Sequence, residues 1–205
     1  MEWLSFLLHI DKYLGLLVQN YNEWVYFILF AIIFIETGVV IMPFLPGDSL
    51  IFIVGTFSAA GYFNLLLMWV ILVTAAIAGD SLNYLFGSYF GKRIARMPFV
   101  KKEYMEKTES FYDKYGAKTI IIARFVPIVR TFAPFIAGIG KMNYRTFLIY
   151  NIVGGLIWVS LFLFGGYYLG TIPFVENNLT LVTIGIILLS LVPPFIEIVR
   201  VKRKA

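Results

Sequence analysis

The feature that most constrains this sequence is a long stretch without charge. From Ser49 to Gly79 there is no acidic or basic residue, and most side chains are apolar. Because about 20 apolar residues cross the hydrocarbon core of a bilayer, this run predicts helices embedded in a membrane. The composition agrees, since 60% of the 205 residues are hydrophobic, 14% are charged and the mean hydropathy is +0.84. Soluble domains carry about 25% charged residues, so we expect an integral membrane protein.

The alternation of apolar stretches and breaks predicts a single all-α membrane domain, residues 1–205, with about four transmembrane helices and two facing re-entrant hairpins. An N-terminal amphipathic helix is expected first, because apolar residues recur there at helical spacing around His9 and Asp11. The expected segments are an amphipathic helix at 3–20, a span at 24–42, a re-entrant hairpin at 43–60, a span at 64–90, a loop at 92–118, a re-entrant hairpin at 119–140, and spans at 146–170 and 179–198.

Two proline-containing segments, 36–50 and 124–138, carry the charges that are hardest to bury. An arginine at the bilayer centre costs about 2.5–3.5 kcal/mol on insertion scales. Proline removes a backbone donor, and a broken helix is tolerated at membrane depth only where protein or a water-filled cavity covers it. We therefore predict that the two segments are broken hairpins whose charges meet. The predicted helix breakers are Pro43, Pro46, Gly47, Pro127, Pro134 and Gly138.

These segments supply the candidate site. Arg124 and Arg130 are predicted to bind a phosphate headgroup, because guanidinium groups stay charged and bind phosphate through paired hydrogen bonds. Glu36 and Asp48 are predicted to pair with these arginines and to exchange protons. An alternative is that Glu36 only marks the membrane interface. The other candidates for the cavity lining, which the sequence equally allows to be packing residues, are Asp80, Asn83 and Asn151.

The basic residues predict the topology. The loop 92–118 contains eight basic and four acidic residues, and the chain ends in the basic segment 196–205. By the positive-inside rule, both are expected on the cytoplasmic side. The two halves then resemble inverted repeats with broken helices, an architecture of transporters that hold their substrate near the bilayer midplane.

Several classes of protein are not expected. The chain has no cysteine, and its single histidine is His9, so thiol chemistry, metal sites and histidine-dependent hydrolysis find no residues. The GDSL tetrapeptide occurs at 47–50 and 79–82 but has no catalytic histidine near it in the sequence. The basic residues lie beside apolar stretches, which is not a nucleic-acid pattern. We expect no enzyme, no cofactor, no metal and no nucleic-acid partner.

Four blocks resemble the signature sequences of the DedA family, also known as the VTT or SNARE-associated domain family. The blocks are ETGVVIMPFLPGDSL, GDSLNYLFG, RFVPIVRTFAPFIAG and GKMNYRTFLIYN. The resemblance implies a multi-pass protein of the bacterial inner membrane with two facing re-entrant hairpins. It also implies that the family's essential acidic pair corresponds to Glu36 and Asp48, and its essential arginine pair to Arg124 and Arg130.

The resemblance further implies a function in lipid transport. Bacterial members are implicated in flipping undecaprenyl phosphate or phosphatidylethanolamine, eukaryotic relatives scramble phospholipids, and members support envelope integrity and the proton motive force. We therefore expect a flippase or scramblase for a phosphate-bearing lipid, linked to protons. The alternatives are a proton-coupled ion or drug antiporter, and an ion-pair network that only locks the fold. The glycine-containing segments 87–91 and 166–170 fit either a homo-oligomer interface or helix packing within one protomer.

Overall fold

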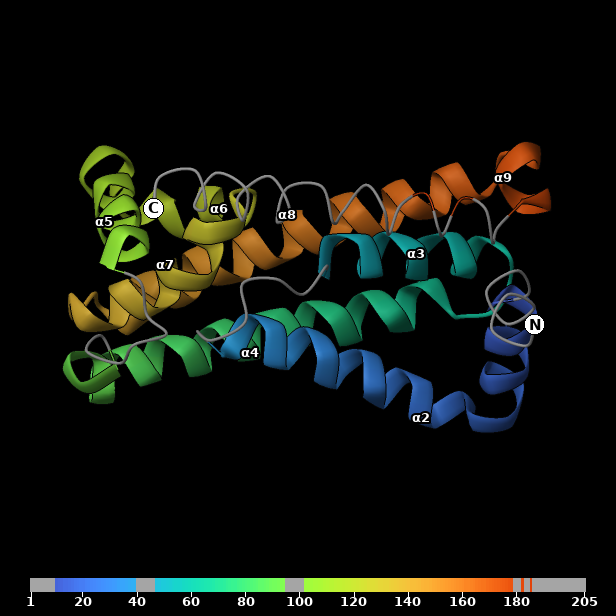
Figure 1. Ribbon diagram of the computed structural model, residues 1–205, viewed down its shortest axis with the longest axis horizontal. Coiled ribbons are helices and arrows are strands. Elements are labelled where there is room, and N and C mark those ends of the chain that lie inside the picture. Colours follow the sequence, from blue (N-terminus) through green and yellow to red (C-terminus); the bar gives the residue numbers. More distant parts are fainter. Residues whose placement is uncertain (1–9, 40–46, 95–101, 179–181, 183–184, 186–205) are drawn as a thin grey trace, which may run out of the picture. The chain divides into compact units, whose positions relative to one another are not determined.

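A computed structural model describes residues 10–39, 47–94 and 102–178, together with 182 and 185. Within these residues all regular secondary structure is helical, which confirms the all-α prediction for the described part of the chain. In chain order, the elements are α2 Ile10–Gly38, α3 Gly47–Ala59, α4 Leu65–Ile94, α5 Lys102–Tyr115, the 3₁₀ turn η1 Gly116–Lys118, α6 Thr119–Ala123, α7 Pro127–Ile139, α8 Tyr144–Gly170 and α9 Pro173–Asn177 (Figure 1).

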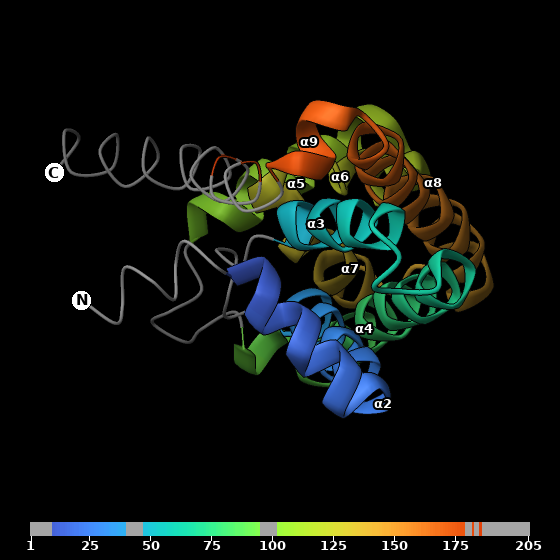
Figure 2. The same ribbon diagram turned by 90° about the vertical axis from the view of Figure 1, so that its right-hand side faces the viewer.

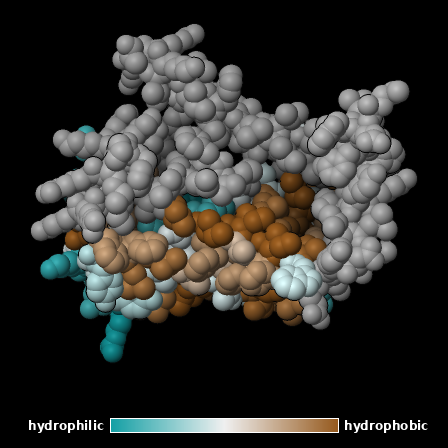
Figure 3. Space-filling view, turned by 60° about the horizontal axis from the view of Figure 1, so that its bottom comes forward, coloured by the Kyte–Doolittle hydropathy of each residue, from teal (hydrophilic) through white to brown (hydrophobic). Residues whose placement is uncertain are grey.

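Two helices are long and apolar enough to cross a membrane, α4 over Leu65–Gly91 and α8 over Tyr144–Gly170. Both expose large apolar side chains, including Leu66 and Ile149, which are 67% and 62% accessible. Figure 3 shows one face of the molecule, on which the described residues are mostly hydrophobic. Monomeric soluble proteins rarely expose large contiguous apolar patches, so lipid is the expected solvent of these helices.

The helices α3 and α7, which lie in the predicted re-entrant segments, are shorter than a membrane is thick. α3 and α7 each contain 13 residues, which at 1.5 Å per residue gives about 20 Å, against about 30 Å for the hydrocarbon core. Neither helix can cross a bilayer alone. Their lengths fit the predicted re-entrant hairpins, which remain a prediction.

The structure assigns one helix, α2 Ile10–Gly38, where the sequence predicts a surface helix at 3–20 and a span at 24–42. The division of α2 into a surface part and a spanning part stays a prediction. The junction, residues 19–24, contains no proline or glycine, so no residue there stops the helix. The short helix α9 is not predicted. The predicted segment 179–198 lies outside the described residues except for 182 and 185, as do residues 3–9 and 40–46.

The second hairpin turns earlier than the prolines suggest. α6 ends at Ala123, and α7 begins at Pro127, a first helical position where the missing N–H costs nothing. Pro134 lies inside α7, and the helix continues through Gly138. The prediction that Pro134 breaks the helix is therefore wrong, because the contacts of α7 with α4 and α5 compensate for one lost backbone bond. Gly138 is the last residue but one of α7. The fourth predicted breaker, Gly47, is the first residue of α3.

The last two predicted breakers, Pro43 and Pro46, lie outside the described residues.

The described residues fall into two compact units. The α3 unit comprises 10–28, 47–69 and 160–178, and the α7 unit comprises 29–39, 70–94 and 102–159.

In the α3 unit, helix α3 packs against the C-terminal part of α8 through glycines. A Cβ atom added at Gly55 would lie 2.8 Å from the Tyr167 nitrogen, and one added at Gly166 would overlap the Phe52 carbonyl oxygen. Such contacts are possible only without side chains, because two helix backbones approach closely where small residues face each other.

The α7 unit uses the same arrangement between α7 and α4. A Cβ at Gly138 would overlap the Tyr84 carbonyl oxygen and lie 2.7 Å from the Ser88 nitrogen, and a Cβ at Gly87 would overlap the Phe135 carbonyl oxygen. The segments 52–55 and 135–138 both read Phe-Ile-x-Gly, and each packs against a Gly-x-x-x-Gly segment. Both glycine segments therefore pack helices within the protomer.

Candidate functional site

The site lies in the α7 unit, where α2 and α4 cross closely. The C-terminal half of α2 runs beside α4 (Figure 1, Figure 2), and a Cβ at Gly38 would lie 3.3 Å from the Gly79 carbonyl oxygen. The two glycines allow the helix backbones to approach. The acidic residues near them, Glu36 and Asp80, are both buried, with 8% and 4% of their surface accessible.

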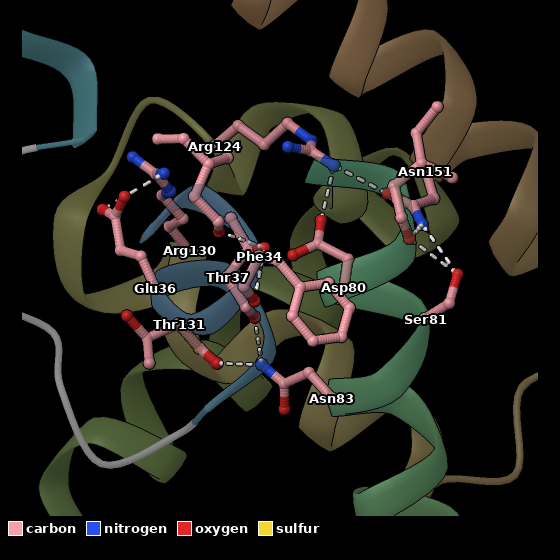
Figure 4. A network of polar contacts seen from close by, with 12 residues as sticks. Phe34, Glu36, Thr37, Asp80, Ser81, Asn83, Arg124, Arg130, Thr131 and Asn151 are labelled. Carbon is pink, nitrogen blue, oxygen red and sulfur yellow. Dashed lines mark hydrogen bonds and ion pairs between the residues drawn. The ribbon is translucent and has the colours of Figure 1, made fainter. Parts of the chain in front are cut away.

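Arg124 forms the most buried ion pair among the described residues. Its Nη2 atom donates to Asp80 Oδ2 at 2.5 Å and to Asn151 Oδ1 at 2.6 Å (Figure 4). The side chains of the ion pair are 2% and 6% accessible. Asn151 is itself fixed, because its Nδ2 atom donates to the Ile77 carbonyl oxygen at 3.0 Å and to Ser81 Oγ at 3.3 Å. The guanidinium group is thus held by two oriented acceptors on one nitrogen.

Arg130 forms the second ion pair. Its Nη2 atom lies 3.3 Å from Glu36 Oε1, and the side chains are 11% and 8% accessible. The guanidinium carbon of Arg130 lies 4.1 Å from the ring centroid of Trp158, and that of Arg124 lies 5.7 Å from the same centroid. Trp158 is fully buried. One indole ring therefore stabilises both cations.

Two hydrogen-bond donors of Arg124 lack an acceptor in the part of the chain that the structure describes. Its Nε and Nη1 atoms are buried and have no hydrogen-bond partner among the described residues. A Cβ atom at Gly154 would lie 3.1 Å from Nε, so a side chain there would crowd the guanidinium group. A buried donor without an acceptor costs about 1–3 kcal/mol, and more when the group is charged. The arrangement therefore suits a ligand that carries anionic oxygen atoms.

Asn83 holds helices together outside the ion pairs. Its Nδ2 atom donates to the carbonyl oxygens of Thr37 on α2, at 3.2 Å, and of Thr131 on α7, at 2.9 Å. Asn83 is fully buried on α4. It fixes the three helices that carry Glu36, Asp80 and Arg130, and we assign it this structural task.

Helix α5, which belongs to the charged segment 92–118, packs against α7. The hydroxyl group of Tyr112 donates to the Ala133 carbonyl oxygen at 2.8 Å, and burial raises the pKa of this phenol above its ordinary value. Met105 packs with Tyr112 against the buried aromatic residues of α7. α5 ends at Tyr115, and Gly116 turns the chain with a φ of 57°. The loop helix is thereby anchored directly to the helix that carries Arg130.

The structure brings together three of the four predicted principal residues. Glu36, Arg124 and Arg130 meet in the α7 unit with Asp80 and Asn151. The fourth, Asp48, lies in the first turn of α3 and belongs to the α3 unit. Among the described residues, no group of three or more His, Cys, Asp or Glu side chains could hold a metal ion.

Trp158, Gly154 and Gly155 lie beside the guanidinium groups, and of these three residues sequence reasoning missed Trp158. A signal was present, since these residues follow Asn151 by seven, three and four positions. That spacing places all of them on one face of a helix. A tryptophan and two glycines on the face of a buried asparagine would have marked that face as the one lining the site.

The fold and the site define an α-helical membrane protein with two ion pairs buried between its helices. The VTT domain family profile matches residues 23–168. The chain is 51% identical to Protein DedA of Escherichia coli (strain K12), over 98% of this chain and 94% of that protein. It is 39% identical to an uncharacterized membrane protein of Mycobacterium leprae, over 81% of this chain and 76% of the relative.

A further relative, Inner membrane protein YghB of Escherichia coli (strain K12), is 36% identical over 75% of this chain and 72% of its own length. No solved structure matches the chain. These matches show that the chain belongs to the DedA family of VTT-domain membrane proteins, as its four sequence blocks predict.

Proposed function

We propose that this protein moves a phosphate-bearing lipid headgroup across the bacterial inner membrane, with undecaprenyl phosphate or a phospholipid such as phosphatidylethanolamine as the substrate. The observation that carries the proposal is that two hydrogen-bond donors of the buried Arg124 side chain have no acceptor among the described residues. This guanidinium is 3% accessible, and its Nε and Nη1 donors have no acceptor among the described residues. A lipid phosphate supplies anionic acceptors, and hydrogen bonds between charged groups are about twice as strong as neutral ones.

The spacing of the two arginines supports one shared ligand. Because both guanidinium carbons lie near the Trp158 centroid, at 4.1 and 5.7 Å, they are at most about 10 Å apart. A phosphorus atom lies about 4 Å from the carbon of a guanidinium that donates to its oxygens. A single phosphate group that contacts both arginines needs their guanidinium carbons within about 8 Å of each other, a spacing that this upper bound includes. The acyl chains would remain in the bilayer, beside the apolar surfaces of α4 and α8.

The carboxylates supply the proposed link to protons. Two arginines and two carboxylates make the network neutral, so a bound phosphate monoanion leaves an excess negative charge unless one carboxylate is protonated. Uncompensated charge in a buried site is costly. Carboxylate and phosphate would thus compete for the arginines, and proton uptake would favour the phosphate. The two carboxylates of this count are Glu36 and Asp80. Glu36 is proposed for this role, and Asp48 stays a further candidate that the sequence predicts.

The topology completes the proposal. The positive-inside rule places the loop 92–118 and the C-terminus in the cytoplasm. The transporter would act without a cofactor or a metal, and without covalent chemistry. The rival function, a proton-coupled ion or drug antiporter, would use the same carboxylates, but two buried arginines would repel a cationic substrate.

Translocation in proteoliposomes tests the proposal. Tail-labelled fluorescent undecaprenyl phosphate and phosphatidylethanolamine are reconstituted, and a membrane-impermeant quencher reports which leaflet holds the label. Arg124→Ala, Arg130→Ala and Glu36→Gln are compared with the wild type, with and without a pH gradient. The matched control is Arg145→Ala, because Arg145 is an exposed arginine on α8.

We expect the wild type and the Arg145 variant to move at least one lipid, and the Arg124 and Arg130 variants to lose most of that movement. Asp48→Asn is included as the second carboxylate variant and is expected to weaken the effect of the gradient. If folded wild-type protein moves neither lipid, while a proton gradient drives a cation instead, the antiporter replaces the proposal.

A further inference from the structure

We propose that the two arginine–carboxylate pairs have different tasks, with Asp80 holding Arg124 permanently and Glu36 releasing Arg130 when a phosphate group binds. The inference rests on the proposed function and specifies which carboxylate exchanges with the substrate. It also assigns Asp80 and Asn151 as positioning residues and Trp158 as a residue of the binding site.

The contacts of Arg124 make its pair a fixed one. A single nitrogen, Nη2, donates at 2.5 and 2.6 Å to Asp80 and Asn151, and both acceptors are almost fully buried. A ligand that displaced Asp80 would leave a buried carboxylate without its cation and would disturb Asn151, which is bonded to α4. The remaining donors, Nε and Nη1, can meet a phosphate without any such loss. Arg124 thus binds the ligand while still paired.

The contacts of Arg130 make its pair exchangeable. The distance to Glu36 is 3.3 Å, longer than in the first pair, and Arg130 is the more accessible of the two arginines. The indole of Trp158, at 4.1 Å from the guanidinium carbon, would still face the cation after the carboxylate has left. Exchange of Glu36 for phosphate therefore leaves Arg130 with both an anion and an aromatic face.

The charge count then locates the proton. Arg130 of α7 is the cation paired with Glu36 in this unit. The other described members of the network are Arg124 at the C-cap of α6, Asp80 of α4, and the uncharged Asn151 and Trp158 of α8, while Tyr112 of α5 has its hydroxyl bonded to Ala133. With Asp80 retained as the partner of Arg124, the carboxylate that becomes neutral on phosphate binding is Glu36.

Isothermal titration calorimetry on the full-length protein tests this assignment. The detergent is dodecyl maltoside, which carries no phosphate. The probe is decyl methyl phosphate, because the single charge of a diester does not titrate near neutral pH, and decyl phosphate serves as a second ligand. Titrations in two buffers of different ionisation enthalpy give the number of protons taken up on binding.

We expect the wild type to take up about one proton for each phosphate bound. Glu36→Gln should bind the probe about tenfold more tightly, since no carboxylate competes for Arg130, and should take up no proton. Asp80→Asn also removes one negative charge from the network, so its proton uptake should fall too, and the carboxylate that takes the proton is identified in the wild type. The matched control is Glu109→Gln, an exposed position on α5, which should behave as the wild type.

An infrared difference spectrum of the wild type identifies the carboxylate that takes the proton. Probe binding should produce a protonated-carboxyl band that is absent in Glu36→Gln and that shifts when the glutamates, but not the aspartates, carry carbon-13. The assignment is overturned if uptake and band survive in Glu36→Gln, or if labelling of the aspartates shifts the band instead. If the wild type binds neither ligand, the proposed function itself fails, which the experiment distinguishes from a wrong choice of carboxylate.

Discussion

Replacing Asp80 by alanine should be among the most destabilising single changes in this protein. Arg124 would keep its charge at 3% accessibility with only the neutral Asn151 as an acceptor. At an effective dielectric constant of about 20, opposite charges about 4 Å apart attract by about 4 kcal/mol. Removing one partner of a buried pair costs about 3–5 kcal/mol, because the other charge remains desolvated.

This loss is large enough to measure by thermal unfolding. In a chain of this size 1 kcal/mol corresponds to about 2–4 °C, so we expect the Tm of Asp80→Ala to fall by roughly 10 °C. The assay follows tryptophan fluorescence in dodecyl maltoside. The matched control is Asp113→Ala, at an exposed position on α5, which should stay within about 1 °C of the wild type.

A double-mutant cycle isolates the pair itself. Arg124→Ala leaves Asp80 buried without its cation and should be destabilising as well. The double variant removes both charges, so it should be less destabilised than the sum of the single variants by about 2–3 kcal/mol. Strictly additive single effects would show that the two side chains do not interact, and the reasoning about the site would then be wrong.

Three further predictions concern packing and binding. Gly166→Ala should lower the Tm by several degrees, because its Cβ would overlap the backbone of Phe52. The neighbouring Gly165→Ala is the control and should be neutral or stabilising by up to about 1 kcal/mol, because no atom lies within 4 Å of its Cβ. Equal effects of the two substitutions would contradict the α3–α8 contact. Tyr112→Phe removes one hydrogen bond to α7 and should cost about 1 kcal/mol in the same assay, and an unchanged Tm would show that the bond is not formed. Trp158→Leu should weaken binding of decyl phosphate by about tenfold, with Trp158→Phe in between, and equal affinity of Trp158→Leu and the wild type would exclude the indole from the site.

Membrane insertion and the identity of most charged site residues followed from the sequence. Glu36, Arg124 and Arg130 stand out because each is a charge within an apolar stretch, and such charges are retained only where a partner or a substrate compensates them. The long helices α4 and α8 were predicted for a related reason, since an apolar stretch of more than 20 residues has few alternatives to a spanning helix.

The partner of Arg124 could not be chosen in the same way. The tetrapeptide Gly-Asp-Ser-Leu occurs twice, so Asp48 and Asp80 have identical local sequences. Which aspartate meets the arginine depends on where α4 passes the end of α6, a contact between residues far apart in the chain. Similarly, Pro134 looked like a helix break, yet α7 continues because its neighbours hold it on both sides.

The sequence by itself thus determined that this protein lies in a lipid bilayer and which of its charges need a partner there, because hydropathy and charge are local properties of the chain. The tertiary structure alone decided how those charges pair. It selected Asp80 as the partner of Arg124, placed both arginines over Trp158, and directed each glycine segment to a hairpin helix of the same protomer. The physical reason is that hydrogen bonds and close backbone contacts depend on where helices cross, and local spacing does not specify that crossing.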